Sequence, residues 1–241
     1  MSRNIITGLD IGSSSVRAIV IEQKKDGTLH ILAAAQKESS GVKRGYINNL
    51  DDASKTISAV VKSLEKISGI SIRNAVISVG GISLSSLKSK AMIRTSRADG
   101  EITDHDIKRL ITQSETGLAN MANKKIIHSI PLSFKVDNNI VYGHPTEMKG
   151  VKLEVETMLV TCLSSHLADL VKTVETAGLS VDDIVASPLA TSYATLTNQQ
   201  KETGCVIVNI GASTVSVVVF EDGLPISLEV FPIGSSHITS D

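Results

Sequence analysis

Tryptophan is absent from this chain of 241 residues, which has only three tyrosines and three phenylalanines. Neither charge is in excess, since 24 lysines and arginines are balanced by 25 aspartates and glutamates. Nucleic-acid binding usually needs a basic surface and aromatic rings on which bases can stack. We therefore expect no nucleic-acid partner.

Residues that form disulfides or metal sites are also scarce. The two cysteines, Cys162 and Cys205, each lie in an apolar run, where cysteine usually behaves as a small buried hydrophobe. None of the six histidines stands at metal-ligand spacing from a cysteine or another histidine. No cysteine or histidine metal site is expected, and a reducing cytoplasmic compartment fits the composition.

Long hydrophobic runs are missing as well. Every apolar stretch falls short of the roughly 20 residues that a helix needs to span a bilayer. The N-terminal MSRNIITG lacks the charged and then apolar layout of a signal peptide. The chain is nevertheless long enough to bury a substantial core, as one large domain or as two or three small ones.

What the sequence does contain is a mixed order of strands and helices, recognised by apolar periods of two and of 3.6 residues. The first part predicts three strands, a helix that Gly69 ends, and a fourth strand. The strands are expected at 5–11, 16–23, 28–36 and within NAVISVGG, and the buried face of the helix should carry Ile57, Val60, Val61, Leu64 and Ile67.

The segment 82–155 has apolar faces of its own and is expected to pack as a separate αβ subdomain. Thr103 and Asp106 resemble a helix capping box with Asp in place of Glu. Strands are expected within SLKSKAMIRTSR and KKIIHSIPLSFKVDN, and the helix between them should bury Ile107, Leu110, Ile111 and Leu118.

The remainder predicts a strand, a helix, a short strand, a second helix and three final strands. Pro188 is well placed as a first-turn proline of the second helix, and TNQQKETG is interpreted as a polar linker. The expected segments are a strand in LEVETMLVTC, a helix at about 165–177, and strands in CVIVNIG, STVSVVVFEDG and PISLEVFPIG.

One phrase occurs twice. Residues 9–22 (LDIGSSSVRAIVIE) and 208–221 (VNIGASTVSVVVFE) share Ile, Gly, Ser, Val, Val and Glu at aligned positions. Each phrase predicts a β-hairpin with small residues at its tip, where uncovered N–H groups can form a concave anion site. One tip would hold a phosphate weakly, whereas two facing tips could grip a polyphosphate. The alternative is a pair of ordinary turns in a duplicated β structure.

Asp10 stands directly before the first tip. A carboxylate beside a bound anion implies a cation between them, and Mg²⁺ typically uses one or two carboxylates together with water. The pattern therefore predicts a magnesium nucleotide in a cleft between two related lobes. No G-x-x-x-x-G-K-[ST] or G-x-G-x-x-G motif is present, which excludes a Walker-type loop and a Rossmann fingerprint.

Paired phosphate hairpins in related lobes resemble the actin/Hsp70/sugar-kinase superfamily. Within it, the chain resembles the bacterial cell-division family FtsA along essentially its whole length. The blocks that carry this resemblance are SSGVKRGYINNLDDASKTISAVVKSLEKISG, VISVGGISLSS, EITDHDIKRLI, IIHSIPLSFKVDN, HPTEMKGVKLEVETMLVT and ASPLATSYATL.

The resemblance implies an α/β fold with an actin-like (ribonuclease H-like) lobe built on a mixed sheet. Residues 1–81 and 156–186 would form this first lobe, and 82–155 would form the inserted αβ subdomain. Residues 187–241 would form only the first hairpin strands of an incomplete second lobe. Family members continue with an adenosine loop and a C-terminal amphipathic membrane helix, so we interpret the chain as an N-terminal portion.

The resemblance also assigns a site. Asp10 would face Mg²⁺ through water, and Asn209 stands where most superfamily members place a second aspartate. Because a neutral amide attracts a metal much less than a carboxylate, metal holding and hydrolysis should both suffer. Ser187 stands where catalytic relatives often carry Glu, so at most a slow ATPase is expected. The two phosphate loops would be Gly12, Ser13, Ser14 and Ser15, and Gly211, Ala212, Ser213 and Thr214.

The implied function is that of a cytoplasmic adaptor at the inner face of the membrane at the division site. Such a protein binds ATP, self-associates, tethers FtsZ filaments to the membrane and recruits later division proteins. Contact with the membrane would require the helix that this chain lacks. A PilM-type pilus-assembly adaptor and, less favoured, a sugar-kinase-type phosphotransferase remain the alternatives.

An incomplete second lobe leads to a prediction about affinity. The chain alone should bind Mg-ATP much more weakly than a complete two-lobed protein, because part of the nucleotide site is missing. Titration calorimetry should give a dissociation constant well above the micromolar range. Micromolar binding would contradict this expectation.

Overall fold

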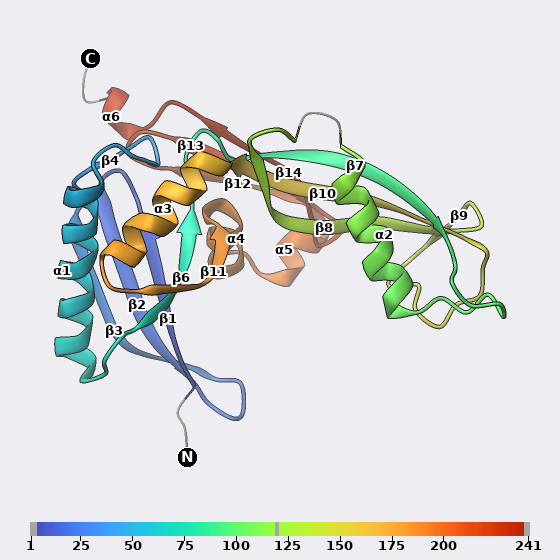
Figure 1. The fold of residues 1–241 in the computed structure, drawn as a ribbon, viewed down its shortest axis with the longest axis horizontal. Coiled ribbons are helices and arrows are strands. Elements are labelled where there is room, and N and C mark those ends of the chain that lie inside the picture. The colour runs from blue at the N-terminus through green and yellow to red at the C-terminus, as the bar shows by residue number, and fades with distance from the viewer. Residues whose placement is uncertain (1–3, 119–120, 239–241) are drawn as a thin grey trace.

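The computed structural model describes residues 4–118 and 121–238. Its largest sheet has five strands in the order β11-β6-β1-β2-β3. The central strand β1 pairs antiparallel with β2 and parallel with β6, so the sheet is mixed as predicted. The strands are β1 (Asn4–Ile11), β2 (Ser15–Gln23), β3 (Leu29–Glu38), β6 (Asn74–Val79) and β11 (Ser180–Ala186) (Figure 1).

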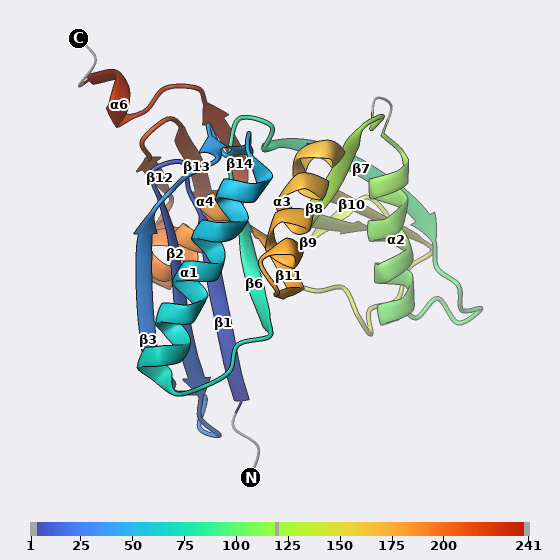
Figure 2. The same cartoon turned by 60° about the vertical axis from the view of Figure 1, so that its left-hand side comes forward.

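Helices α1 (Leu50–Ser68) and α3 (Ser164–Thr176) pack side by side on one face of this sheet (Figure 2). The short strands β4 (Val42–Lys43) and β5 (Tyr46–Ile47) form a hairpin just before α1. The side chain of Asn49 caps α1, and Gly69 ends it in the left-handed conformation, as predicted. The expectation that Ile67 is buried was wrong: it lies in the last turn and is 61% exposed.

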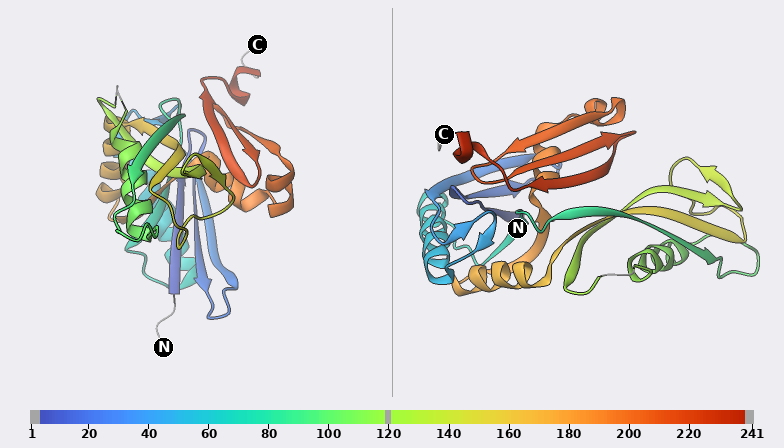
Figure 3. Two further views of the ribbon diagram at one scale, coloured as in Figure 1. Left: turned by 90° about the vertical axis from the view of Figure 1, so that its right-hand side faces the viewer. Right: turned by 90° about the horizontal axis from the view of Figure 1, so that it is seen from above.

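A second sheet has the order β7-β10-β8-β9 and extends away from the first (Figure 3). Helix α2 (Asp104–Thr116) packs against it over a separate apolar cluster that includes Ile107 and Leu110. The predicted capping box at Thr103 is present. Leu118 was wrongly placed on this helix, which ends at Thr116. The strands are β7 (Ser85–Arg94), β8 (Lys124–Val136), β9 (Asn139–Val141) and β10 (Lys152–Leu163).

The third sheet contains the last three predicted strands in the order β12-β13-β14. The segment interpreted as a polar linker contains a further helix, because Thr197 and Gln200 form a second capping box. Two hydrogen bonds between Ser86 on β7 and Leu228 on β14 join this sheet to the second one. The elements are α4 (Ser187–Thr195), α5 (Asn198–Thr203), β12 (Cys205–Ile210), β13 (Val215–Glu221), β14 (Leu224–Phe231) and α6 (Ser235–Ile238).

None of the helices within residues 4–118 and 121–238 is both long and apolar enough to cross a membrane.

The capping box of α2 gives a stability prediction. Asp106 has no exposed surface and accepts hydrogen bonds from the backbone of Ser96 and Thr103. Burial alone would raise the pKa of Asp106, but the hydrogen bonds from Thr103 and Ser96 outweigh burial and hold the pKa below its usual value. Asp106→Ala would leave these donors without an acceptor, so it should lower the free energy of unfolding by about 2–3 kcal/mol.

Urea denaturation measures this change, and Asp104→Ala is the matched control. Asp104 is in the same helical turn but is exposed, and it accepts an exposed hydrogen bond from the Thr146 hydroxyl, so its replacement should lower the free energy of unfolding by less than about 1 kcal/mol. Equal losses in the two variants would contradict the role given to Asp106.

Candidate functional site

Strand register places a row of polar side chains across the five-stranded sheet. Asp10 on β1 lies opposite Arg17 on β2, and Arg17 lies opposite Gln36 on β3. On the other side of β1, Ser78 of β6 donates a hydrogen bond from Oγ to Asp10 Oδ1 at 2.5 Å. Because side chains alternate along a strand, this row lies on the face opposite the buried Leu9, which packs in the core.

The row forms one wall of a cleft with a volume of about 810 Å³. The cleft is also lined by Ser187 and Thr191 of α4 and by Asn209 of β12. The structure therefore brings Asp10, Ser187 and Asn209 into one cavity, although they are far apart in the sequence. The volume lies within the range of small-molecule and cofactor sites, about 300–1,000 Å³.

The first hairpin tip is a tight turn held by its neighbours. The Gly12 N–H donates to the Ser15 carbonyl at 3.1 Å. A Cβ on Gly12 would lie 3.0 Å from that oxygen, so glycine suits this position. The backbone N–H of Ser39 donates to the Ser14 carbonyl, and Ser13 Oγ accepts the N–H of Gly45. These contacts fix the tip against the end of β3 and the β4–β5 turn.

The second tip repeats the first. The Gly211 N–H donates to the Thr214 carbonyl at 2.9 Å, and a Cβ on Gly211 would again lie 3.0 Å from the carbonyl oxygen. The N–H groups of Ser235 and Ser236 donate to the carbonyls of Gly211 and Ala212, so the start of α6 rests on this tip. The duplicated phrase thus adopts the same closing geometry twice.

Two serine hydroxyls beside the tips have no hydrogen-bond partner in the described structure. Ser213 Oγ belongs to the second tip, and Ser39 Oγ lies next to the first; both atoms are shielded from water. A buried polar atom without a partner costs about 1–3 kcal/mol, and a phosphate oxygen is an acceptor that would satisfy such a hydroxyl. An anionic ligand at the tips could therefore satisfy these two hydroxyls, whereas the third hydroxyl of this kind in the described residues, that of Thr161, lies on β10.

The described residues offer few side chains that could coordinate a metal ion. Within residues 4–118 and 121–238, no group of three or more His, Cys, Asp or Glu side chains could hold a metal ion. Asp10 is the acidic residue among those that line the cleft. Mg²⁺ often keeps several waters and uses one or two carboxylates with the phosphates of its nucleotide. The donor set fits Mg²⁺ only as part of a magnesium nucleotide.

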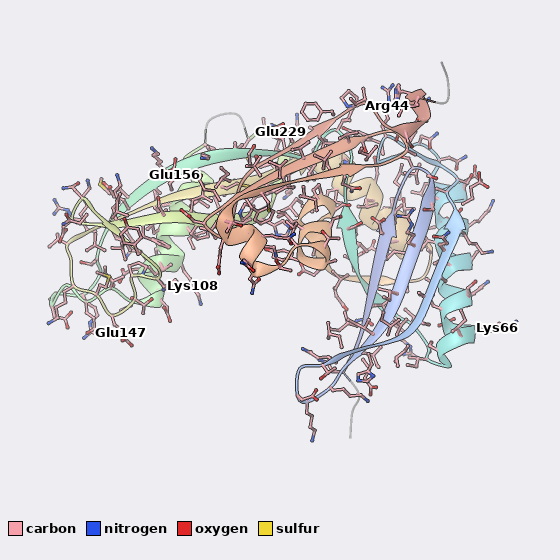
Figure 4. The ribbon with its side chains drawn as sticks, turned by 180° about the vertical axis from the view of Figure 1, so that it is seen from behind. Arg44, Lys66, Lys108, Glu147, Glu156 and Glu229 are labelled. Atoms are coloured by element: carbon pink, nitrogen blue, oxygen red, sulfur yellow. The ribbon has the colours of Figure 1, made fainter. Side chains whose placement is uncertain are left out.

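Both tips lie at the same end of the molecule as α6 (Figures 1 and 3). Seen from behind, Arg44 of the β4–β5 turn also lies at this end (Figure 4). The tip residues Gly12–Ser15 and Gly211–Thr214 are not among the residues found to line the cleft. That both tips converge on one ligand stays a prediction.

Comparison with known proteins identifies the family. Residues 81–161 match the family model described as the SHS2 domain inserted in FTSA. Over 241 residues the chain is 34% identical to the cell division protein FtsA of Borreliella burgdorferi, and over 240 residues it is 31% identical to that of Pseudomonas aeruginosa. The chain belongs to the FtsA family. Both alignments include the whole chain, which spans 58% of the length of the first relative and 57% of the length of the second.

A solved structure supports the fold of this FtsA-family chain. One chain of the PilM–PilN type IV pilus biogenesis complex superposes on this chain with a TM-score of 0.65 and 14% sequence identity. The superposition covers 98% of this chain and 63% of the chain in the complex. This likeness concerns the fold alone, and it confirms the predicted actin-like α/β class.

Arg17 and Gln36 were missed by reasoning from sequence. Neither belongs to the repeated glycine and hydroxyl motif, and no spacing pattern singles them out. The signal was available in the hairpin: a turn closed between Gly12 and Ser15 places Asp10 opposite Arg17. Arg17 gives the cleft a cation that the second copy of the phrase lacks, because Ser216 stands at the aligned position there.

Two histidines join parts of the structure without lining the cleft. His128 Nε2 accepts the Ala186 N–H at 2.9 Å, at the point where β11 leads into α4. Burial lowers the pKa of His128, and Asp183 opposes this in part. His166 is 1% exposed, and burial lowers its pKa as well. The expectation that neither is a metal ligand stays a prediction.

These shifts predict how stability depends on pH. A histidine with a lowered pKa in the folded state binds fewer protons there than in the unfolded chain. Its contribution to stability is therefore complete above the unfolded pKa of about 6.5 and is lost as the pH falls below that value. The free energy of unfolding should decrease from pH 7.5 to pH 5.5.

Denaturation across this range tests the effect, with His128→Gln as the comparison. Glutamine does not titrate and retains an oxygen acceptor for Ala186. The slope should become smaller, since each histidine accounts for at most about 1.4 kcal/mol per pH unit. An unchanged slope would exclude His128 as one of its sources.

Proposed function

We propose that this FtsA-family chain carries the phosphate-binding part of an actin-like nucleotide site, with ATP as the nucleotide and Mg²⁺ as its cation. One observation carries the proposal: the repeated phrase gives two tips of equal geometry, each next to a buried hydroxyl that lacks a partner. Gly12 and Gly211 close the two turns with their own N–H groups, and the backbone N–H groups of Ser13–Ser15 and Ala212–Thr214 would hold the phosphates.

The charged residues in the cleft have distinct roles in this proposal. Asp10, oriented by the hydroxyl of Ser78, would hold Mg²⁺ through water. Arg17, opposite Asp10 on the neighbouring strand, would offset phosphate charge. Asn209 would contribute a neutral amide that binds a cation only weakly. The metal would supply charge neutralisation at the phosphates.

Binding is favoured over rapid hydrolysis. The residues that line the cleft include one carboxylate, Asp10, which already accepts a hydrogen bond from Ser78. Ser187 and Asn209 stand where catalytic relatives often carry Glu and where most superfamily members carry a second aspartate. Neither side chain is a good general base near neutral pH. We therefore propose at most slow ATP hydrolysis, with nucleotide binding in a structural role.

At the level of the cell, we propose the adaptor role of the family: self-association, tethering of FtsZ filaments to the membrane and recruitment of later division proteins at the inner face of the membrane. The proposed division has a first lobe at 1–81 and 156–186, an inserted subdomain at 82–155 and the start of a second lobe at 187–241. The separate apolar cluster around Leu110 supports the inserted subdomain.

Nucleotide binding by an Asp10→Asn variant tests the proposal. The substitution keeps the size of the side chain and removes the charge that attracts the cation. Affinity for Mg-ATP, measured with a fluorescent analogue, should fall about tenfold, equivalent to about 1.4 kcal/mol. Affinity for ATP in EDTA should remain the same or rise, because Asp10 then only repels phosphate.

Asp51→Asn provides the matched control, since Asp51 is exposed in the first turn of α1, on the other face of the sheet. It should bind like the unmodified chain. No detectable binding by the unmodified chain at millimolar Mg-ATP, or equal affinities in all three proteins, would overturn the proposed site.

A further inference from the structure

A buried histidine links the first tip to the start of the second sheet. His166, in the first turn of α3, is 1% exposed, and both of its ring nitrogens have hydrogen-bond partners. Nε2 lies 2.8 Å from the carbonyl oxygen of Gly45, and Nδ1 lies 2.6 Å from Ser83 Oγ. The ring also stacks on Tyr46, with centroids 4.3 Å apart.

The partners define which nitrogen carries the proton. The Gly45 carbonyl can only accept, so the hydrogen must be on Nε2 of His166. In the neutral ring Nδ1 is then an acceptor, and the hydroxyl of Ser83 donates to it. Burial, which lowers the pKa of His166, favours this neutral form.

The connection continues from Gly45 into the first tip. The backbone N–H of Gly45 donates to Ser13 Oγ at 3.0 Å. One peptide turn therefore contacts the tip through its N–H and His166 through its carbonyl. The result is a hydrogen-bonded path from Ser13 through Gly45 and His166 to Ser83, which stands two residues before β7.

Two glycines allow the turns to approach so closely. Gly45 has φ +83°, and a Cβ there would lie 2.5 Å from the Cα of Gly81. Gly81 has φ +92°, and a Cβ on it would lie 2.8 Å from the Arg44 carbonyl and 3.3 Å from the His166 ring. Any larger residue would push the β4–β5 turn away from the start of β7.

We propose that His166 is a positioning residue that fixes the first hairpin tip relative to the start of the inserted β-sheet subdomain. The ring is buried and both of its nitrogens have protein partners, so a displacement of the tip would either move Ser83 or break a buried hydrogen bond. The inference that nucleotide binding uses this path rests on the proposed function, whereas the mechanical link itself does not.

Hydrogen exchange of the chain without nucleotide tests the link. His166→Phe keeps the stacking ring and removes both hydrogen bonds. Amide exchange in segments 10–16, 41–49 and 80–88 should become about tenfold faster, while segment 124–136 of β8 should remain unchanged. Uniformly faster exchange, or no change in segments 10–16 and 80–88, would overturn the proposal.

His128→Phe is the control, because it makes the same chemical change at the contact with Ala186. It should affect segment 180–190 and leave segments 10–16 and 41–49 as they are. If His166→Phe does not fold, Ser83→Ala replaces it and should accelerate exchange about threefold in segments 10–16 and 41–49. Exchange equal to that of the unmodified chain would then overturn the proposal.

Addition of millimolar Mg-ATP separates the two claims. Slower exchange in segments 10–16 and 80–88 of the unmodified chain, with the slowing of 80–88 lost in the variant, would support transmission through His166. Slowing of 80–88 that persists in the variant would overturn it. Unchanged exchange in segment 10–16 would count against the proposed nucleotide site, and the comparison without nucleotide would still decide the mechanical link.

Discussion

The register of β1 is the constraint on which the candidate site depends. Antiparallel pairing with β2 places Arg17 opposite Asp10, and parallel pairing with β6 brings Ser78 within hydrogen-bond distance of the same carboxylate. A shift of one residue would turn Asp10 into the apolar core and Leu9 into the cleft. The buried face of the sheet, covered by α1 and α3, prevents that shift. The core thus determines where the charged groups lie.

The β12–β13 hairpin repeats the turn of the β1–β2 hairpin but not its charged residues. The two tips share the glycine-closed turn, whereas the charged pair Asp10 and Arg17 is replaced by Asn209 and Ser216. The second tip therefore offers N–H groups and hydroxyls without a carboxylate to hold a cation. This asymmetry agrees with the proposed site, in which a phosphate chain would contact both tips and a metal only the side of Asp10.

Much of the fold was predictable because its elements depend on local patterns. The first three strands, the helix ended by Gly69 and the capping box at Thr103 were placed within a few residues of their positions in the structure. The helix at Asn198 was missed, although Thr197 and Gln200 carry the same capping signal as Thr103.

The site was predictable only in part. Asp10, which lines the cleft, and the two glycine-closed turns were expected from the sequence, whereas the role of the turns in binding stays a prediction. Arg17, Gln36 and Ser78 join them through pairing between strands, and His166 through contacts between segments more than 80 residues apart. Such tertiary neighbours leave no periodic trace in the sequence, so only the three-dimensional arrangement reveals them.

A crystal structure of the chain soaked at high concentration with Mg²⁺ and a non-hydrolysable ATP analogue tests the central claim most directly. The account predicts one ligand whose phosphate oxygens lie within hydrogen-bond distance of backbone N–H groups in both Gly12–Ser15 and Gly211–Thr214, with the cation on the side of Asp10. A ligand bound at one tip only, or outside the space between them, would contradict it.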